Sequence, residues 1–177
     1  MRFLLFFLSA CLPLAAAEPE LREHSLSDAK ASVQLPAGWE SKAEAPEEEG
    51  VSVYHLGKPA DAGGAEVAPM TLSVTTKVPE RTEQKPSEYA AALLDIPLDD
   101  GSSAPVEKVA LCGLPSLRAE YDFEGGAGKM RAVSVAIPND RTGTLYFFAW
   151  QAPLDEPLEV ESLREKVIAS LKIDPEF

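Results

Sequence analysis

Two histidines, His24 and His55, are the residues available for imidazole chemistry in this sequence. A histidine-based nucleophile system needs one of them beside a serine or a cysteine. His55 shares a predicted strand face with Val51 and Val53, which favours a partly buried structural histidine, and His24 lies in a polar segment. The sequence contains no Gly-x-Ser-x-Gly, Gly-x-x-x-x-Gly-Lys, His-Glu-x-x-His or Cys-x-x-Cys motif. It therefore predicts no catalytic residue.

Acidic clusters are the other source of chemistry that the sequence offers. Calcium needs six or more oxygens that converge from a shaped loop. The Glu47–Glu49 run and the group of Asp95, Asp99 and Asp100 lack EF-hand spacing, so we expect no metal site and no cofactor. Carboxylate pairs could serve a glycosidase. With 29 acidic residues, however, such pairs arise by chance.

One charged row alternates with an apolar row between residues 116 and 124. Arg118, Glu120, Asp122 and Glu124 share one face of the predicted strand, and the intervening residues are apolar or aromatic. We interpret this row as a solvated charge ladder, because burying it without partners would be too costly. The alternative is a docking face for a basic partner, where complementary charge would set encounter rate and orientation.

Residues 1–17 read MRFLLFFLSACLPLAAA, which is the pattern of a secretory signal peptide. Arg2 supplies the positive charge, and a small-residue site precedes Glu18. We expect cleavage between Ala17 and Glu18 and a periplasmic or secreted protein. The apolar stretch is shorter than the roughly 20 residues of a permanent membrane span. We therefore expect no integral membrane span.

Each of the two cysteines allows two interpretations. Cys11 ends the segment Leu8-Ser9-Ala10-Cys11, which resembles a bacterial lipobox, so a lipid-anchored envelope lipoprotein is the alternative to cleavage after Ala17. After that cleavage Cys112 is the one cysteine left and has no internal disulfide partner. We expect Cys112 to be a buried small hydrophobe, with a reactive or dimer-forming thiol as the alternative.

Length and charge bound the class of protein. The chain has 177 residues, 45% of them hydrophobic and 25% charged, which fits a single globular domain. The formal net charge of −13 repels phosphate backbones, so we expect no nucleic-acid partner. We divide the chain into the signal peptide, a polar lead-in over 18–28 and one domain over 29–177.

The sequence predicts both strands and helices to position these residues. Period-two patterns predict strands, and the Ala- and Leu-rich segment 87–94 and the segment 157–173 predict helices. Helix 87–94 starts either after Ser87 as the N-cap or at Pro86 as the first helical residue. The expected strands are 31–35, 51–57, 70–78, 106–112, 116–124, 129–137 and 144–150, the last one central because it is apolar on both faces. We expect an α+β fold with the order βββαββββα: a single twisted antiparallel sheet of six to seven strands with two packed helices.

A resemblance to a known family rests on several of these features together. They are the strand that runs into Leu35-Pro36-Ala37-Gly38-Trp39, the Val109–Gly113 strand and turn, the strand 117–123, the Tyr146–Trp150 strand and the closing helix. The sequence resembles the PsbP-like fold family, including DcrB-like bacterial exported proteins, over roughly residues 25–173. The resemblance implies a largely non-enzymatic protein that docks to other proteins, and it supplies no catalytic residues.

We therefore expect an exported, non-catalytic binding or accessory domain that docks to a protein partner in the cell envelope. The rival interpretation is a small secreted hydrolase with an unrecognised site. A concave pocket that holds His55 or a carboxylate pair with perturbed pKa values would favour the hydrolase.

Overall fold

The structure is a computed structural model, and it describes residues 20–45, 48–59, 70–126, 128–174 and 176–177. The predicted signal peptide, its cleavage site at Ala17 and Glu18, and the alternative lipidation site at Cys11 lie outside these residues. Glu47, part of the acidic run, lies outside them too.

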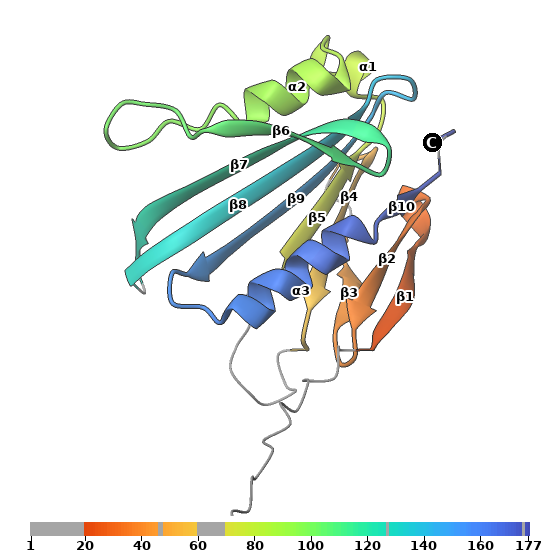
Figure 1. Cartoon of the computed structure of the whole chain (residues 1–177). Coiled ribbons are helices and arrows are strands. Elements are labelled where there is room, and N and C mark those ends of the chain that lie inside the picture. The colour runs from red at the N-terminus through yellow and green to blue at the C-terminus, as the bar shows by residue number, and fades with distance from the viewer. Residues whose placement is uncertain (1–19, 46–47, 60–69, 127, 175) are drawn as a thin grey trace, which may run out of the picture.

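A seven-stranded antiparallel sheet forms the centre of the described chain (Figure 1). The strand order across it is β3-β4-β5-β9-β8-β7-β6. Its strands are β3 (Glu40–Ala43), β4 (Val51–Gly57), β5 (Met70–Thr75), β6 (Val106–Leu111), β7 (Leu114–Gly125), β8 (Gly128–Asn139) and β9 (Thr144–Pro153). The strand β9 lies in the middle of this order, as its two apolar faces predict.

A second, three-stranded antiparallel sheet has the order β1-β2-β10. It joins β1 (Leu21–Leu26), β2 (Ala31–Pro36) and β10 (Lys172–Ile173), with the 3-10 turn η1 (Ser27–Ala29) between the first two. The helices are α1 (Val78–Thr82), α2 (Pro86–Leu93) and α3 (Leu158–Ala169). Pro86 occupies the first helical position of α2, which settles the alternative left open above.

The α+β class and the antiparallel pairing are confirmed, and the two expected helices correspond to α2 and α3. In place of a single sheet, the described residues form two antiparallel sheets, and the short helix α1 is additional. The expected strand 31–35 belongs to the smaller sheet and pairs with residues 21–26, which the sequence indicated only as a polar lead-in. Residues 40–43, expected in a loop, form the edge strand β3. Edge strands need only one apolar face or none, so polar sequences such as Leu21–Leu26 carry a weak strand signal.

The large sheet is covered differently on its two faces (Figure 1). One face packs against α3 and the smaller sheet, with a core that includes Leu72, Phe148, Val33 and Ile168. On the other face Ala119, Ala136 and Leu145 of the sheet pack with Val78, Ala90 and Leu94 at and around α1 and α2. Because α2 has eight residues, it covers only part of that face.

A fully buried arginine lies on α3 beside the large sheet. Arg164 is 0% exposed and forms an ion pair through both terminal nitrogens with the carboxylate of Glu156, which precedes the helix. Its guanidinium carbon also lies 6.0 Å from the ring centroid of Trp150 on β9. A buried guanidinium is tolerated only when it is paired in this way.

Candidate functional site

A tight turn joins β6 to β7 at an exposed corner of the large sheet. Leu111 and Leu114 pair across it, so Cys112 and Gly113 form a two-residue loop. Both loop residues have positive φ, 53° for Cys112 and 74° for Gly113, as a type I′ hairpin turn requires. Glycine accepts this conformation readily, whereas a cysteine in it is uncommon.

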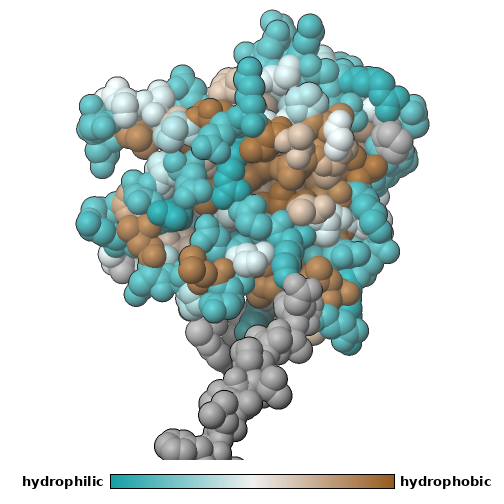
Figure 2. Space-filling model, viewed as in Figure 1, coloured by the Kyte–Doolittle hydropathy of each residue, from teal (hydrophilic) through white to brown (hydrophobic). Residues whose placement is uncertain are grey.

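The residues around this turn carry no charge. We call Val109, Ala110, Leu111, Cys112 and Leu114 the β6–β7 apolar patch. Ala110 and Cys112 are exposed, and the other three are partly buried. Figure 2 shows an extended apolar area at this place, between β6 and the C-terminal end of α3. Contiguous apolar surface, unlike a single exposed leucine, is typical of interaction sites.

Cys112 is exposed, which corrects the expectation that it is a buried small hydrophobe. The reason is the hairpin geometry: the residue occupies the loop position of the turn and cannot reach the core. Its Sγ lies 3.0 Å from the carbonyl oxygen of Leu171 and donates to it. Partial burial of the sulfur raises the pKa of the thiol, so the thiol stays protonated at neutral pH.

The charged row of β7 faces α3. Arg118 donates to Glu165 of α3 over 2.7 Å and to Glu120 over 3.2 Å. Its guanidinium carbon lies 6.0 Å from the ring centroid of Trp150. The row shares its sheet face with the main core, because Arg118 is directly opposite the buried Val135 of β8.

A second arginine, Arg131 of β8, completes this network. Its Nε donates to Asp122 over 3.0 Å, and one terminal nitrogen lies 3.3 Å from Glu120. The bond to Asp122 raises the pKa of this guanidinium further above its ordinary value. Glu124 is opposite Lys129 in the strand register. The structure thus brings the four predicted residues together, with much of their charge satisfied internally.

The histidine and the acidic residues that could take part in catalysis or metal binding lie at the surface. His55 Nε2 lies 3.4 Å from a carboxylate oxygen of Glu44, and the His55 side chain is 43% exposed. Asp95 accepts a hydrogen bond from Ser103, and Asp100 accepts two from Ser102. Among the described residues, no group of three or more His, Cys, Asp or Glu side chains is arranged to hold a metal ion.

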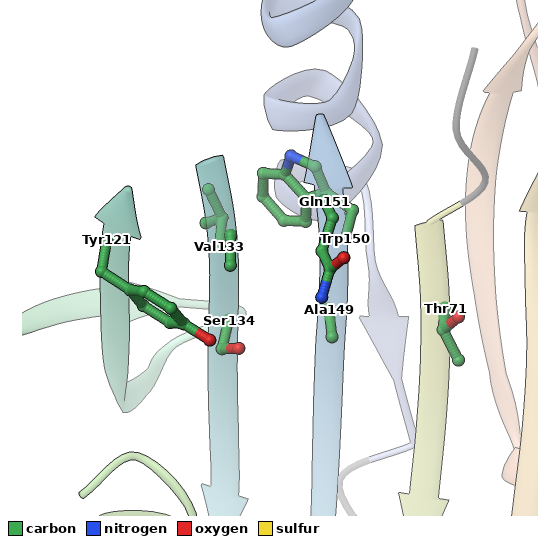
Figure 3. A pocket seen from close by; sticks show the side chains of 8 residues that line it. Thr71, Tyr121, Val133, Ser134, Ala149, Trp150 and Gln151 are labelled. Atoms are coloured by element: carbon green, nitrogen blue, oxygen red, sulfur yellow. The ribbon is translucent and has the colours of Figure 1, made fainter. Parts of the chain in front are cut away.

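A shallow groove of about 350 Å³ lies on the sheet face that α2 leaves partly uncovered (Figure 3). We call it the sheet groove. Two cross-strand rows form it. The first row is Thr71, Ala149 and Ser134 on β5, β9 and β8, and the second is Gln151, Ala132 and Tyr121 on β9, β8 and β7.

Each row places a small alanine between two polar side chains. Figure 3 shows the Tyr121 ring pointing toward Ser134 and the amide of Gln151 pointing toward Ala149. Val133 and Trp150 also line the groove, but their side chains belong to the opposite face of the sheet, so they contribute main chain. None of the eight described lining residues is charged.

Sequence reasoning did not find this groove. Its residues come from four strands, and their alignment depends on the register of long-range strand pairs. A usable signal was present within β8 and β9, where alternate positions carry small or polar side chains: Ala132, Ser134 and Ala136 on β8, and Ala149 and Gln151 on β9.

The described residues include no helix long and apolar enough to cross a membrane.

Comparison with known sequences gives no match: no family model and no curated protein matches this chain.

Solved structures with a similar fold do exist. CyanoP, the cyanobacterial PsbP of Synechocystis sp. PCC 6803, has a TM-score of 0.58 at 15% identity, over 94% of this chain and 99% of CyanoP. LpqN of Mycobacterium tuberculosis, a protein involved in cell envelope biogenesis, has a TM-score of 0.51 at 14% identity, over 89% of this chain and 92% of LpqN.

A protein of Bacteroides thetaiotaomicron has a TM-score of 0.51 at 11% identity, over 82% of this chain. The chain spans 45% of the length of that protein. The chain thus has a PsbP-like fold. At these identities the likeness concerns the fold alone.

Proposed function

We propose that this protein is an exported, non-catalytic accessory domain that docks to a protein partner in the cell envelope through the β6–β7 apolar patch. The observation that carries the proposal is the patch itself. Seven consecutive uncharged residues, Val109–Pro115, form an exposed corner on a chain with a net charge of −13. A contiguous apolar centre with charged surroundings is the usual anatomy of a protein interface.

Rigidity favours the same assignment. Leu111 and Leu114 pack against the main core, so their positions are fixed before a partner arrives. The turn between them is short, and Cys112 is held against Leu171. A preformed contact surface costs little ordering entropy on binding.

Export to the envelope is supported by the sequence and by the fold. Residues 1–17 have the pattern of a signal peptide. LpqN, which has a similar fold, is involved in cell envelope biogenesis. A net charge of −13 disfavours anionic membrane surfaces as the target of the patch, which leaves a protein as the proposed occupant.

The charged row of Arg118, Glu120, Asp122 and Glu124 remains a second proposed contact surface for a basic partner. Its ion pairs with Glu165 and Arg131 reduce the charge that it offers. Replacing Arg118 with alanine separates two roles. Weaker partner binding at an unchanged unfolding midpoint would favour docking, whereas a lower midpoint with unchanged binding would make the row structural.

Site-specific cross-linking tests the proposal at the patch. Cys112 is the one cysteine in residues 18–177, so a benzophenone maleimide can be attached there without any substitution. The labelled protein is irradiated with the envelope fraction of its own host. We expect one cross-linked protein. An excess of unlabelled protein should compete for the partner and abolish this cross-link. Once identified and purified, this partner should bind the wild-type protein and fail to bind the Cys112→Asp variant.

The matched control moves the label to another exposed apolar position. In the double variant Cys112→Ser, Leu93→Cys the label lies on α2, where Leu93 is 39% exposed. The proposal predicts no specific product from this position. It is overturned if both positions give the same products, if Cys112 gives none, or if the labelled patch inserts into vesicles made from the lipids of the host envelope.

A further inference from the structure

We propose that the sheet groove binds a neutral sugar. The site lies on the opposite face of the large sheet from α3 and is separate from the β6–β7 apolar patch. The inference does not depend on the docking function proposed above.

The first argument is the arrangement of polar groups. Neighbouring strands lie about 4.8 Å apart, and alternate residues along a strand about 7 Å apart. Thr71 and Ser134 flank Ala149 in one row, and Gln151 and Tyr121 flank Ala132 in the next. The second row is shifted by one strand relative to the first, since the first row spans β5 to β8 and the second spans β9 to β7. The four polar side chains therefore stand at the corners of a skewed area, about 10 Å long along each row and with the rows about 7 Å apart, and two methyl groups form its floor.

The second argument is that these groups have unused bonding capacity. Within the described part of the chain, the side chains of Thr71, Tyr121, Ser134 and Gln151 form no hydrogen bond with another residue. Each hydroxyl can both donate and accept, and the amide offers two donors and an acceptor. The hydroxyl groups of a sugar need this mixture of donors and acceptors.

The third argument is the aromatic wall. The ring of Tyr121 leans into the groove (Figure 3). The ring of Phe123 follows on the same strand face, with its centroid 6.0 Å from that of Tyr121. An aromatic face accepts the weakly polarised C–H groups of a sugar ring. A volume of about 350 Å³ lies near the lower end of the range for small-ligand pockets, which suits one or two sugar rings.

The fourth argument separates a sugar from other ligands. No charged side chain lines the described groove, so an anion or a cation would lose hydration without gaining a counter-charge. The floor of the groove consists of two small alanines, so a protein side chain would find no deep apolar pocket there.

Amide NMR spectra of the protein test the site directly. D-glucose, N-acetyl-D-glucosamine and maltose are titrated into the millimolar range, with D-glucuronate and D-glucosamine as charged counterparts. We expect at least one neutral sugar to shift the amides of both groove rows. The charged counterparts should bind more weakly, and the amides of the β6–β7 apolar patch should not move.

Three variants make the test specific. Ala149→Leu fills the floor and should abolish the shifts. Gln151→Ala removes one exposed amide and should weaken binding roughly five-fold, the equivalent of one hydrogen bond. Cys112→Asp should leave sugar binding unchanged, which keeps this inference distinct from the docking proposal.

The inference is overturned if none of the three neutral sugars shifts the groove amides, if the charged sugars bind as strongly as the neutral ones, or if Ala149→Leu still binds. Should Ala149→Leu fail to fold, the exposed Gln151→Ala variant decides, and unchanged affinity there would also overturn the inference.

Discussion

Arg164 of α3 is a fully buried charge beside the large sheet. Its side chain is 0% exposed, and its guanidinium is paired with Glu156, whose own side chain is 13% exposed. The sequence could not reveal this burial. The sequence predicts a helix over 157–173, but a charge within such a segment is ordinarily assigned to the solvated side. Only the packing of Trp150 against the helix makes the burial visible.

Breaking this pair should be costly. We expect Glu156→Gln to lower the free energy of unfolding by about 3 kcal/mol, because a buried guanidinium would lose its counter-charge. The double variant Glu156→Gln, Arg164→Met should lose less than the sum of the two single variants. Urea unfolding of the four proteins measures the coupling, and additive losses would show that the two side chains act independently.

The contribution of Tyr146 to the stability of the folded protein is lost at alkaline pH. Burial raises the pKa of its hydroxyl to about 12, with Asp174 and Cys112 adding to the shift. In the unfolded chain a tyrosine titrates near about 10. The folded state therefore holds the proton more tightly, and the stability from this group is complete below about pH 10 and is lost as pH rises toward about 12.

The test compares wild type with Tyr146→Phe. We expect the urea midpoint of the wild-type protein to fall between about pH 10 and about pH 12, and the variant to fall less over the same interval. Equal slopes for the two proteins would mean that Tyr146 contributes nothing to the alkaline loss.

At the scale of elements, α2 is held to the sheet by a turn from another part of the chain. Asp140, between β8 and β9, accepts hydrogen bonds from the backbone N–H of Ser87 over 2.8 Å and from its hydroxyl over 2.7 Å. A carboxylate at the first turn of a helix also interacts favourably with the helix dipole. The sequence predicted α2 and the position of Pro86. It could not predict this contact, because Asp140 and Ser87 are 53 residues apart in the sequence.

Removing this contact should loosen α2 selectively. We expect Asp140→Ala to lower the free energy of unfolding by about 1 kcal/mol and to speed amide exchange in α2. Asp100→Ala is a matched control, since Asp100 likewise accepts from the N–H and hydroxyl of one serine, Ser102, but within its own turn. Faster exchange of α2 in both variants would contradict the assignment.

The central strands and helix α3 could be predicted because their sequences carry periodic apolar patterns, and helix α2 because its Ala- and Leu-rich sequence has a high helix propensity. Strand β9 is the clearest example, since both of its faces are covered near the middle of the sheet. Strand β3 and helix α1 could not be predicted, because their sequences ESKA and VPERT carry no periodic apolar face. Tertiary pairing, rather than local propensity, holds such segments in place.

The apolar and polar rows of β7 were identified correctly, and one end of the charged row is exposed as expected, with the Asp122 side chain 52% exposed. The other end differs, because Arg118 is 20% exposed and pairs with Glu165 of α3. Position along a strand indicates which residues share a face. It does not indicate which neighbour covers that face.

The chain combines a net charge of −13 with the exposed apolar corner at the β6–β7 turn. A net charge of this size opposes self-association, which favours the proposal that the corner contacts a different protein. The sheet groove lies on a different face, so docking and ligand binding could occur on the same molecule. The PsbP-like fold provides the rigid sheet on which both surfaces are placed.

A native mass spectrum of the protein purified from its own host tests the docking claim most directly. Cys112→Asp is the informative variant, because aspartate fits the positive φ of the turn while it places a charge in the β6–β7 apolar patch. We predict that both proteins begin at Glu18. The wild-type protein should carry a second, bound protein, and the Cys112→Asp variant should not. A partner retained by both proteins, or bound by neither, would contradict the account.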